Sequence, residues 1–260
     1  MKRTELIEIY KKVLMDIINA KYVHKFGRKN KYDNEYYLNK IFEVLFFGVC
    51  WEDFNNKGIC ESTIRKKFYK WRDDHIFIAA YKIILKEYTK QRIIKELFID
   101  STIIENANCC ELIDKYYKVK TKNQFKISVI CDNNRVPLSY AISNPKPHDV
   151  TFVKPLIENL DCHLKKDTFV VGDKGYITND PIIKQKNIKI TIVAPKRKNQ
   201  KKVFDSHNEY LLNKRYKIEQ LFSHLKRTYR RLKYCYDRYI KNYETFLIMG
   251  ITCQIIRSVK

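Results

Sequence analysis

The chain of 260 residues is long enough for one large domain or two smaller ones, and its apolar share of 45% is typical of a globular protein and not of a disordered one. Its 52 Lys and Arg against 29 Asp and Glu give a formal net charge of +23, a self-repulsion that favours a polyanionic partner, most commonly nucleic acid. The basic residues are spread along the chain instead of lying on one amphipathic helix, which argues against a membrane surface as that partner.

The sequence shows no sign of membrane insertion or export. Its longest apolar runs, 44–51 and 246–251, are far shorter than the ~20 residues of a spanning helix, and the N-terminus lacks the apolar core of a signal peptide. The eight cysteines form no Cys-x-x-Cys pair and no spacing that suits zinc. Reduced structural thiols are therefore expected, and they indicate an intracellular protein.

The first 90 residues contain no proline, and their apolar residues recur at helical spacing. Ser62 is the expected N-cap of a third helix in this region, with Ile64, Phe68 and Trp71 on its apolar face. The opposite face of that helix is basic and includes Arg65, Lys66, Lys67 and Lys70. Three short helices ending in a basic one suit a helix-turn-helix module, and a plain helical bundle with a solvated basic face is an equally good interpretation.

Short β-branched or aromatic runs follow from residue 94 onward, at 94–99, 125–130, 136–142, 168–171 and 188–193. One helix is predicted over about 149–160, a short one between the last two runs, and a long one from about residue 207. This order of elements predicts an α/β fold in which helices cover a sheet.

Two aspartates each follow one of the predicted strands. Asp100 comes after the run 96–99, and Asp173 comes after the run 169–172. Strand ends are rigid and open to a crevice, so they are good positions for metal ligands. Two-metal phosphoryl chemistry needs carboxylates that converge on paired Mg²⁺ or Mn²⁺ ions. For each aspartate taken alone, a turn or cap residue is the alternative.

Glu219 lies in the last predicted helix, beside an apolar stripe formed by Ile218, Leu221, Phe222, Leu225, Tyr229 and Leu232. At 100° per residue, four cations fall on the same side of the helix as Glu219, namely Arg215, Lys226, Arg230 and Lys233. One acid among four cations suits a metal ligand beside a phosphate track. A surface ion pair between Arg215 and Glu219 is the alternative.

Taken together, these residues resemble the DDE transposases of bacterial insertion sequences, in the superfamily that contains the families numbered four and five. Asp100-Ser-Thr resembles the first acidic motif, and Asp173-Lys-Gly-Tyr resembles the second. Arg215, Glu219 and Lys226, separated by three and then by six residues, have the spacing of the third. Other segments that resemble this family are 48–51, 62–71, 126–129, 143–149, 230–231 and 238–239.

The resemblance implies a ribonuclease-H-like catalytic domain over residues 93–260, preceded by a helical DNA-binding domain over residues 1–92. It implies that Asp100, Asp173 and Glu219 hold two Mg²⁺ or Mn²⁺ ions, cleave DNA at the ends of a mobile element and transfer the strand into target DNA. The implied partners are double-stranded DNA, as terminal inverted repeats and as target, and further copies of the chain in a dimer or larger synaptic complex. The residues expected to contact DNA are Arg215, Lys226, Arg230, Lys196, Arg197, Arg65, Lys66 and Lys70.

Two alternatives to a transposase remain open. One is a domesticated relative that only binds DNA, as a sequence-specific regulator, and the other is a metal-dependent nuclease that cuts without joining. The presence of all three acids favours catalysis. In each case the expected location is with DNA inside the cell, in a bacterial cytoplasm or nucleoid, or in the nucleus or viral factory of another host.

Overall fold

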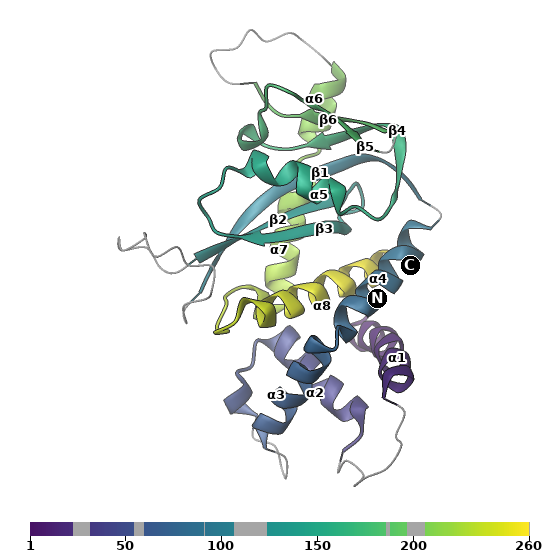
Figure 1. Cartoon of the computed structure of the whole chain (residues 1–260), viewed down its shortest axis with the longest axis vertical. Helices are drawn as coiled ribbons and strands as arrows, with labels where there is room; N and C mark the ends of the chain where they lie inside the picture. The colour runs from purple at the N-terminus through teal and green to yellow at the C-terminus, as the bar shows by residue number, and fades with distance from the viewer. Residues whose placement is uncertain are drawn as a thin grey trace. The chain divides into compact units, whose positions relative to one another are not determined.

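The structure is a computed structural model that describes residues 1–22, 32–54, 60–90, 92–106, 124–185, 188–196 and 206–259 (Figure 1). The chain forms two compact units. The first unit comprises Met1–Leu85 and Leu225–Lys260, and the second comprises Lys86–His224. Within the described ranges, no helix is both long enough and apolar enough to cross a bilayer.

The first unit is helical. Its elements are α1 (Arg3–Lys21), α2 (Asn34–Phe47), η1 (Trp51–Asp53), α3 (Glu61–Asp73), most of α4 (Ile76–Thr89), η4 (Arg230–Leu232) and α8 (Ile240–Val259). Helix α8 packs against α1, α2 and α3, and its Phe246 stacks on Phe68 with ring centroids 4.8 Å apart. Because α8 is apolar on most of its circumference, it forms the centre of this unit.

The helical N-terminal part is confirmed, with two differences from the predicted boundaries. Helix α3 begins at Glu61 with Cys60 as its N-cap, so the expected cap Ser62 lies inside the first turn. The expected division after residue 92 also differs from the observed units, because residues 225–260 belong to the first unit and not to the sheet. The physical reason is the apolar surface of α8, which is buried by the N-terminal helices.

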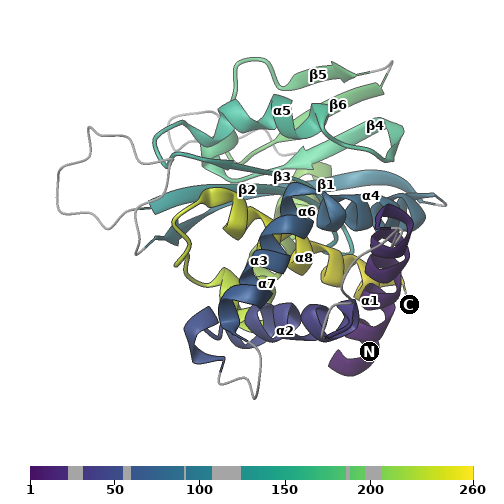
Figure 2. The ribbon, with the colours of Figure 1, turned by 60° about the horizontal axis from the view of Figure 1, so that its bottom comes forward.

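The second unit is built on a mixed six-stranded sheet. Its strands are β1 (Ile93–Glu105), β2 (Gln124–Asp132), β3 (Pro137–Ser143), β4 (His163–Val171), β5 (Ile182–Gln185) and β6 (Ile188–Val193). The spatial order is β3-β2-β1-β4-β6-β5. The first three strands are antiparallel, β4 and β6 run parallel to β1, and β5 pairs antiparallel at the edge (Figure 2).

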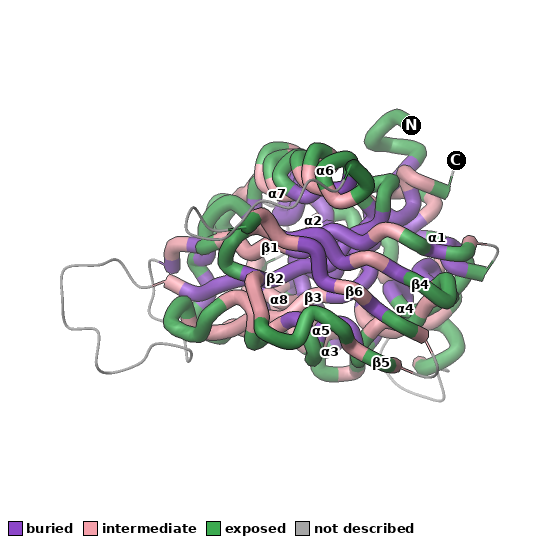
Figure 3. Tube along the Cα trace, turned by 90° about the horizontal axis from the view of Figure 1, so that it is seen from above, coloured by how far each residue is buried: buried purple, intermediate pink, exposed green. Residues whose placement is uncertain are grey.

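Helices cover both faces of this sheet. Their bounds are η2 (Asp149–Phe152), α5 (Val153–Glu158), η3 (Lys174–Tyr176), α6 (Ser206–Asn213) and α7 (Tyr216–Thr228). Figure 3 shows α6 and α7 on one side of the sheet and α5 on the other, with buried strands between them. The sequence predicts this α/β arrangement correctly, including a short helical turn, η3, between β4 and β6, but it misses the short edge strand β5 that follows η3. The predicted long helix is interrupted after Asn213, so it forms α6 and α7.

Candidate active site

Asp100 lies within β1 and not at its end, because β2 continues to pair with β1 as far as Glu105. Its carboxylate is half-buried and accepts a hydrogen bond from the backbone N–H of Ser101 at 2.8 Å. Burial, with a smaller contribution from the carboxylates of Asp173 and Glu219, raises the pKa of Asp100 to about 6, against the opposing effects of the Ser101 N–H and the Arg215 guanidinium. Both predicted partner acids therefore lie close enough to Asp100 to act on its charge.

Strand register explains why the first two acids are neighbours. In the parallel pair of β1 and β4, Phe98 lies opposite Val171. Asp100 and Asp173 each follow these partners by two residues, so extending the register places the two acids side by side. The β4 strand ends at Val171, which leaves Asp173 in the turn that leads into η3. There its Oδ1 accepts a hydrogen bond from the N–H of Gly175 at 2.7 Å.

Glu219 comes from the other side of the site, in the first turn of α7. The helix is held on the sheet by its own side chains, because Lys217 donates to Asn133 Oδ1 at 2.5 Å and Gln220 accepts from Arg135 at 3.0 Å. The Glu219 side chain is about half exposed and pairs with Arg215, with 2.6 Å between Oε1 and Nη2. The ion pair that the sequence offered as the alternative is thus present.

The three carboxylates fit divalent metal ions by their chemistry, because Mg²⁺ and Mn²⁺ prefer hard oxygen ligands. They also share one electrostatic environment around Asp100. Among the described residues, however, no three His, Cys, Asp or Glu side chains are gathered closely enough to enclose an ion as they stand. Glu219 is turned to Arg215, so its carboxylate would have to rotate away from that guanidinium to complete the site.

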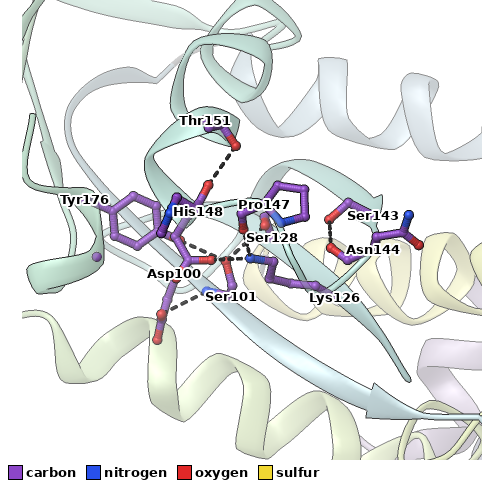
Figure 4. Close-up of polar contacts among 12 residues, drawn as sticks. Asp100, Ser101, Lys126, Ser128, Ser143, Asn144, Pro147, His148, Thr151 and Tyr176 are labelled. Carbon is purple, nitrogen blue, oxygen red and sulfur yellow. Dashed lines mark hydrogen bonds and ion pairs between the residues drawn. The ribbon is translucent and has the colours of Figure 1, made fainter. Parts of the chain in front are cut away.

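A polar cluster near Asp100, formed by Ser101, Ser128, Tyr176, Lys126 and Asp149, was not assigned a role from the sequence. The hydroxyls of Tyr176 and Ser128 each lie 3.0 Å from that of Ser101. Lys126 pairs with Asp149, with 2.8 Å between Nζ and Oδ1 (Figure 4). The sequence offered a signal for these residues only through family-like segments, because the contacts join positions far apart in the chain.

The structure distributes the predicted DNA-contacting residues over both units. Arg215 lies at the acids, and Lys226 is half-buried about two turns after Glu219 in α7, with a pKa that burial lowers. Arg230 was expected on the same helical face, but α7 ends at Thr228, so Arg230 instead begins η4. Lys196 is exposed and follows β6, whereas Arg197 lies outside the described residues. On α3, Arg65 is half-buried, and Lys66 and Lys70 are exposed.

Comparison with known proteins places the chain in a family. A family model described as a transposase DDE domain matches residues 91–254, which include all three acids. The chain belongs to the DDE transposases. A search of curated proteins found no match to this DDE transposase.

A solved structure similar to this DDE transposase is the cryo-EM structure of a piggyBac transposase synaptic complex with hairpin DNA. The two chains are 12% identical with a TM-score of 0.55, and the match covers 98% of this chain and 72% of the other. At this identity the likeness shows a shared fold. The mixed sheet with flanking helices is therefore the ribonuclease-H-like fold that the sequence predicts.

Proposed function

We propose that this DDE transposase cleaves DNA at the ends of a mobile element and joins the freed strand to target DNA. Asp100, Asp173 and Glu219 would hold two divalent metal ions, Mg²⁺ or Mn²⁺. The observation that carries the proposal is the parallel pairing of β1 with β4, whose register brings Asp100 and Asp173 side by side in the unit that also contains Glu219. Family membership gives the reaction class to which this geometry is suited.

The residues of the site have separable roles in this reaction. When bound, the metal ions would activate the attacking oxygen and stabilise the leaving oxygen of the phosphodiester. The half-buried Asp100 and the turn residue Asp173 give two ligands on a rigid sheet. Glu219 supplies the third after leaving Arg215, whose guanidinium then becomes available to a phosphate oxygen. A planar guanidinium is well matched to that ligand.

DNA binding is proposed for basic residues near the acids in the sequence and for the helical N-terminal part of the chain. Lys226, Arg230, Lys196 and Arg197 would contact phosphates, while Arg65, Lys66 and Lys70 of α3 would read terminal sequence. The net charge of +23 favours this assignment. A dimer or larger synapse acting on DNA inside the cell is the corresponding proposed assembly, and the similar piggyBac transposase forms a synaptic complex with hairpin DNA.

A non-catalytic DNA-binding protein is the second candidate, and the Arg215–Glu219 ion pair is the observation in its favour. Such a protein would bind the same DNA but leave it uncut. A nuclease without strand transfer would cut and stop.

One experiment separates the three candidates. The substrate is a plasmid that carries the DNA flanking the reading frame, incubated with and without Mg²⁺, followed by a strand-transfer assay with pre-nicked ends. A transposase nicks only with metal and joins the pre-nicked ends, and Asp100→Asn abolishes both reactions. Nicking by Asp100→Asn at the wild-type rate would contradict the proposed role of the acids.

A further inference from the structure

Lys126, Asp149 and Tyr176 surround the two aspartates without belonging to the proposed ligand set. They come from β2, η2 and η3, which are distant in sequence. Figure 4 shows Lys126 and Tyr176 near Asp100, and Asp149 pairs with Lys126. Buried polar groups of this kind require specific partners, because an unpaired one is costly. Their partners therefore indicate what the cluster holds in place.

Tyr176 connects the turn of Asp173 to the strand of Asp100. Its side chain is fully buried, and its hydroxyl shares a hydrogen bond with Ser101 Oγ at 3.0 Å. Ser101 is also the residue whose N–H donates to Asp100. The ring fits only because Gly172 has no side chain, since a Cβ there would lie 2.6 Å from the tyrosine Cδ2. The absence of a side chain at Gly172 is therefore what allows the tyrosine ring to pack here.

Lys126 and Asp149 form an ion pair next to Gly175 in the same turn. Lys126 is only 5% exposed, and its ammonium group donates to the carbonyl of Pro147 at 2.5 Å as well as to Asp149 at 2.8 Å. Gly175 lies close to two carboxylates. If it carried a Cβ, that atom would be 2.9 Å from Asp173 Oδ1 and 3.2 Å from Asp149 Oδ2. Gly175 therefore fits between two carboxylates, one of which is neutralised by the buried lysine.

We propose that Tyr176 is a positioning residue, which sets the separation of Asp173 from Asp100 through its hydroxyl contact with Ser101, while the Lys126–Asp149 pair supports the same turn beside Gly175. The inference rests on the proposed function, because it assigns the network to a metal site. It differs from a purely structural role in a measurable way. Loss of the hydroxyl should loosen the turn and weaken metal binding more than it changes overall stability.

The test compares Tyr176→Phe with Tyr88→Phe. Tyr88 is a matched control because it is buried in the same unit and its hydroxyl donates to Asp132 Oδ2 at 2.5 Å. Mn²⁺ affinity is measured by titration of the DNA-free protein, and amide hydrogen exchange of residues 174–176 is measured without metal. Tyr176→Phe should weaken Mn²⁺ binding about 10–100-fold, as for other residues that orient metal ligands, and should speed exchange in the turn. Tyr88→Phe should leave both close to wild type.

A second variant, Ser101→Ala, removes the other end of the contact and keeps the test informative if Tyr176→Phe folds poorly. Its loss of Mn²⁺ affinity should match that of Tyr176→Phe, and the double variant should lose little more than either alone. Wild-type Mn²⁺ affinity in both Tyr176→Phe and Ser101→Ala would overturn the positioning role alone. An equal loss in Tyr88→Phe would overturn it too. A wild-type protein that binds no Mn²⁺ would overturn the proposed metal site as well.

Discussion

Glu219 forms an ion pair with Arg215 that would have to open before Glu219 could bind a metal ion. The pair is at least partly exposed on both sides, and exposed pairs contribute only about 0–1 kcal/mol, so exchanging it for a metal contact has a small free-energy cost. The pair is thus compatible with a catalytic Glu219. In the proposed function it would also give Arg215 a second role, since the guanidinium would be released toward DNA when the carboxylate turns.

Arg215→Gln should leave Mn²⁺ affinity in the DNA-free protein unchanged or slightly higher, because Glu219 loses its competitor. DNA binding should weaken at the same time, since the guanidinium is lost. Lys154→Gln is the matched control, because it removes another exposed i, i+4 pair, with Glu158, on α5. A clear loss of Mn²⁺ affinity specific to Arg215→Gln would show that the arginine supports the site directly.

Gly172→Ala should disturb the packing of Tyr176 next to the candidate site. The added methyl group would lie 2.6–2.9 Å from the Cδ2, Cγ and Cβ atoms of Tyr176, closer than carbon atoms approach in folded proteins. Overpacking of this kind typically lowers the free energy of unfolding by about 1–3 kcal/mol. Denaturant unfolding of wild type and variant measures the change, and equal midpoints would mean that the ring is not confined as the structure indicates.

Local sequence patterns predict single candidate residues more readily than the contacts between them. Asp100 and Asp173 were visible because an acid after an apolar run is a local pattern, and Glu219 because helical periodicity gives its side of the helix. Tyr176 could not be assigned a role in this way, because its partner Ser101 lies 75 residues away in the chain. The ion pair of Glu219 with Arg215 was predicted only as the alternative to a metal ligand.

At the level of elements, the parallel pairing of β1 with β4 brings the acids together, and long-range contacts determine where elements end. The sequence placed Asp100 at a strand end, but β1 extends to Glu105 because β2 pairs along its whole length. The edge strand β5 was missed since its pairing with β6, and not its composition, makes it a strand. Periodicity did identify α7, whose stripe residues Ile218, Leu221 and Leu225 are buried.

Lys126→Met tests the contact between β2 and η2. The substitution keeps the volume of the buried stem but leaves Asp149 without its cation. Because the Asp149 side chain is 32% exposed, water can compensate in part, and we expect a loss of about 1–3 kcal/mol of unfolding free energy and not the larger loss of a fully buried pair. Thermal unfolding checks this, and the double variant Lys126→Met/Asp149→Leu should recover part of the loss. Identical stability of Lys126→Met and wild type would contradict a stabilising pair.

For the whole molecule, the positive charge governs the encounter with DNA. A net charge of +23 predicts affinity that falls steeply as salt rises, through release of counterions from the phosphates. The composition alone predicts this dependence on salt. It does not predict how the chain divides into two compact units. Residues 225–260 belong to the first unit because α8 buries its apolar surface among helices at the other end of the chain.

Lys226→Ala should reduce the slope of log affinity against log salt by about 1, if Lys226 contacts one phosphate. Fluorescence anisotropy over a series of salt concentrations gives the slope for wild type and variant. Lys184→Ala, which removes an exposed basic residue of edge strand β5, provides a comparison. An unchanged slope in Lys226→Ala would remove this residue from the proposed phosphate contacts.

The central claim is that Asp100, Asp173 and Glu219 form one metal site. A crystal structure of the protein grown with Mn²⁺, with anomalous scattering used to locate the ions, tests it most directly. We predict Mn²⁺ in contact with carboxylate oxygens of all three residues, with Glu219 turned away from Arg215. Ions bound elsewhere, or a Glu219 that stays on Arg215 while the two aspartates hold no metal, would contradict the account.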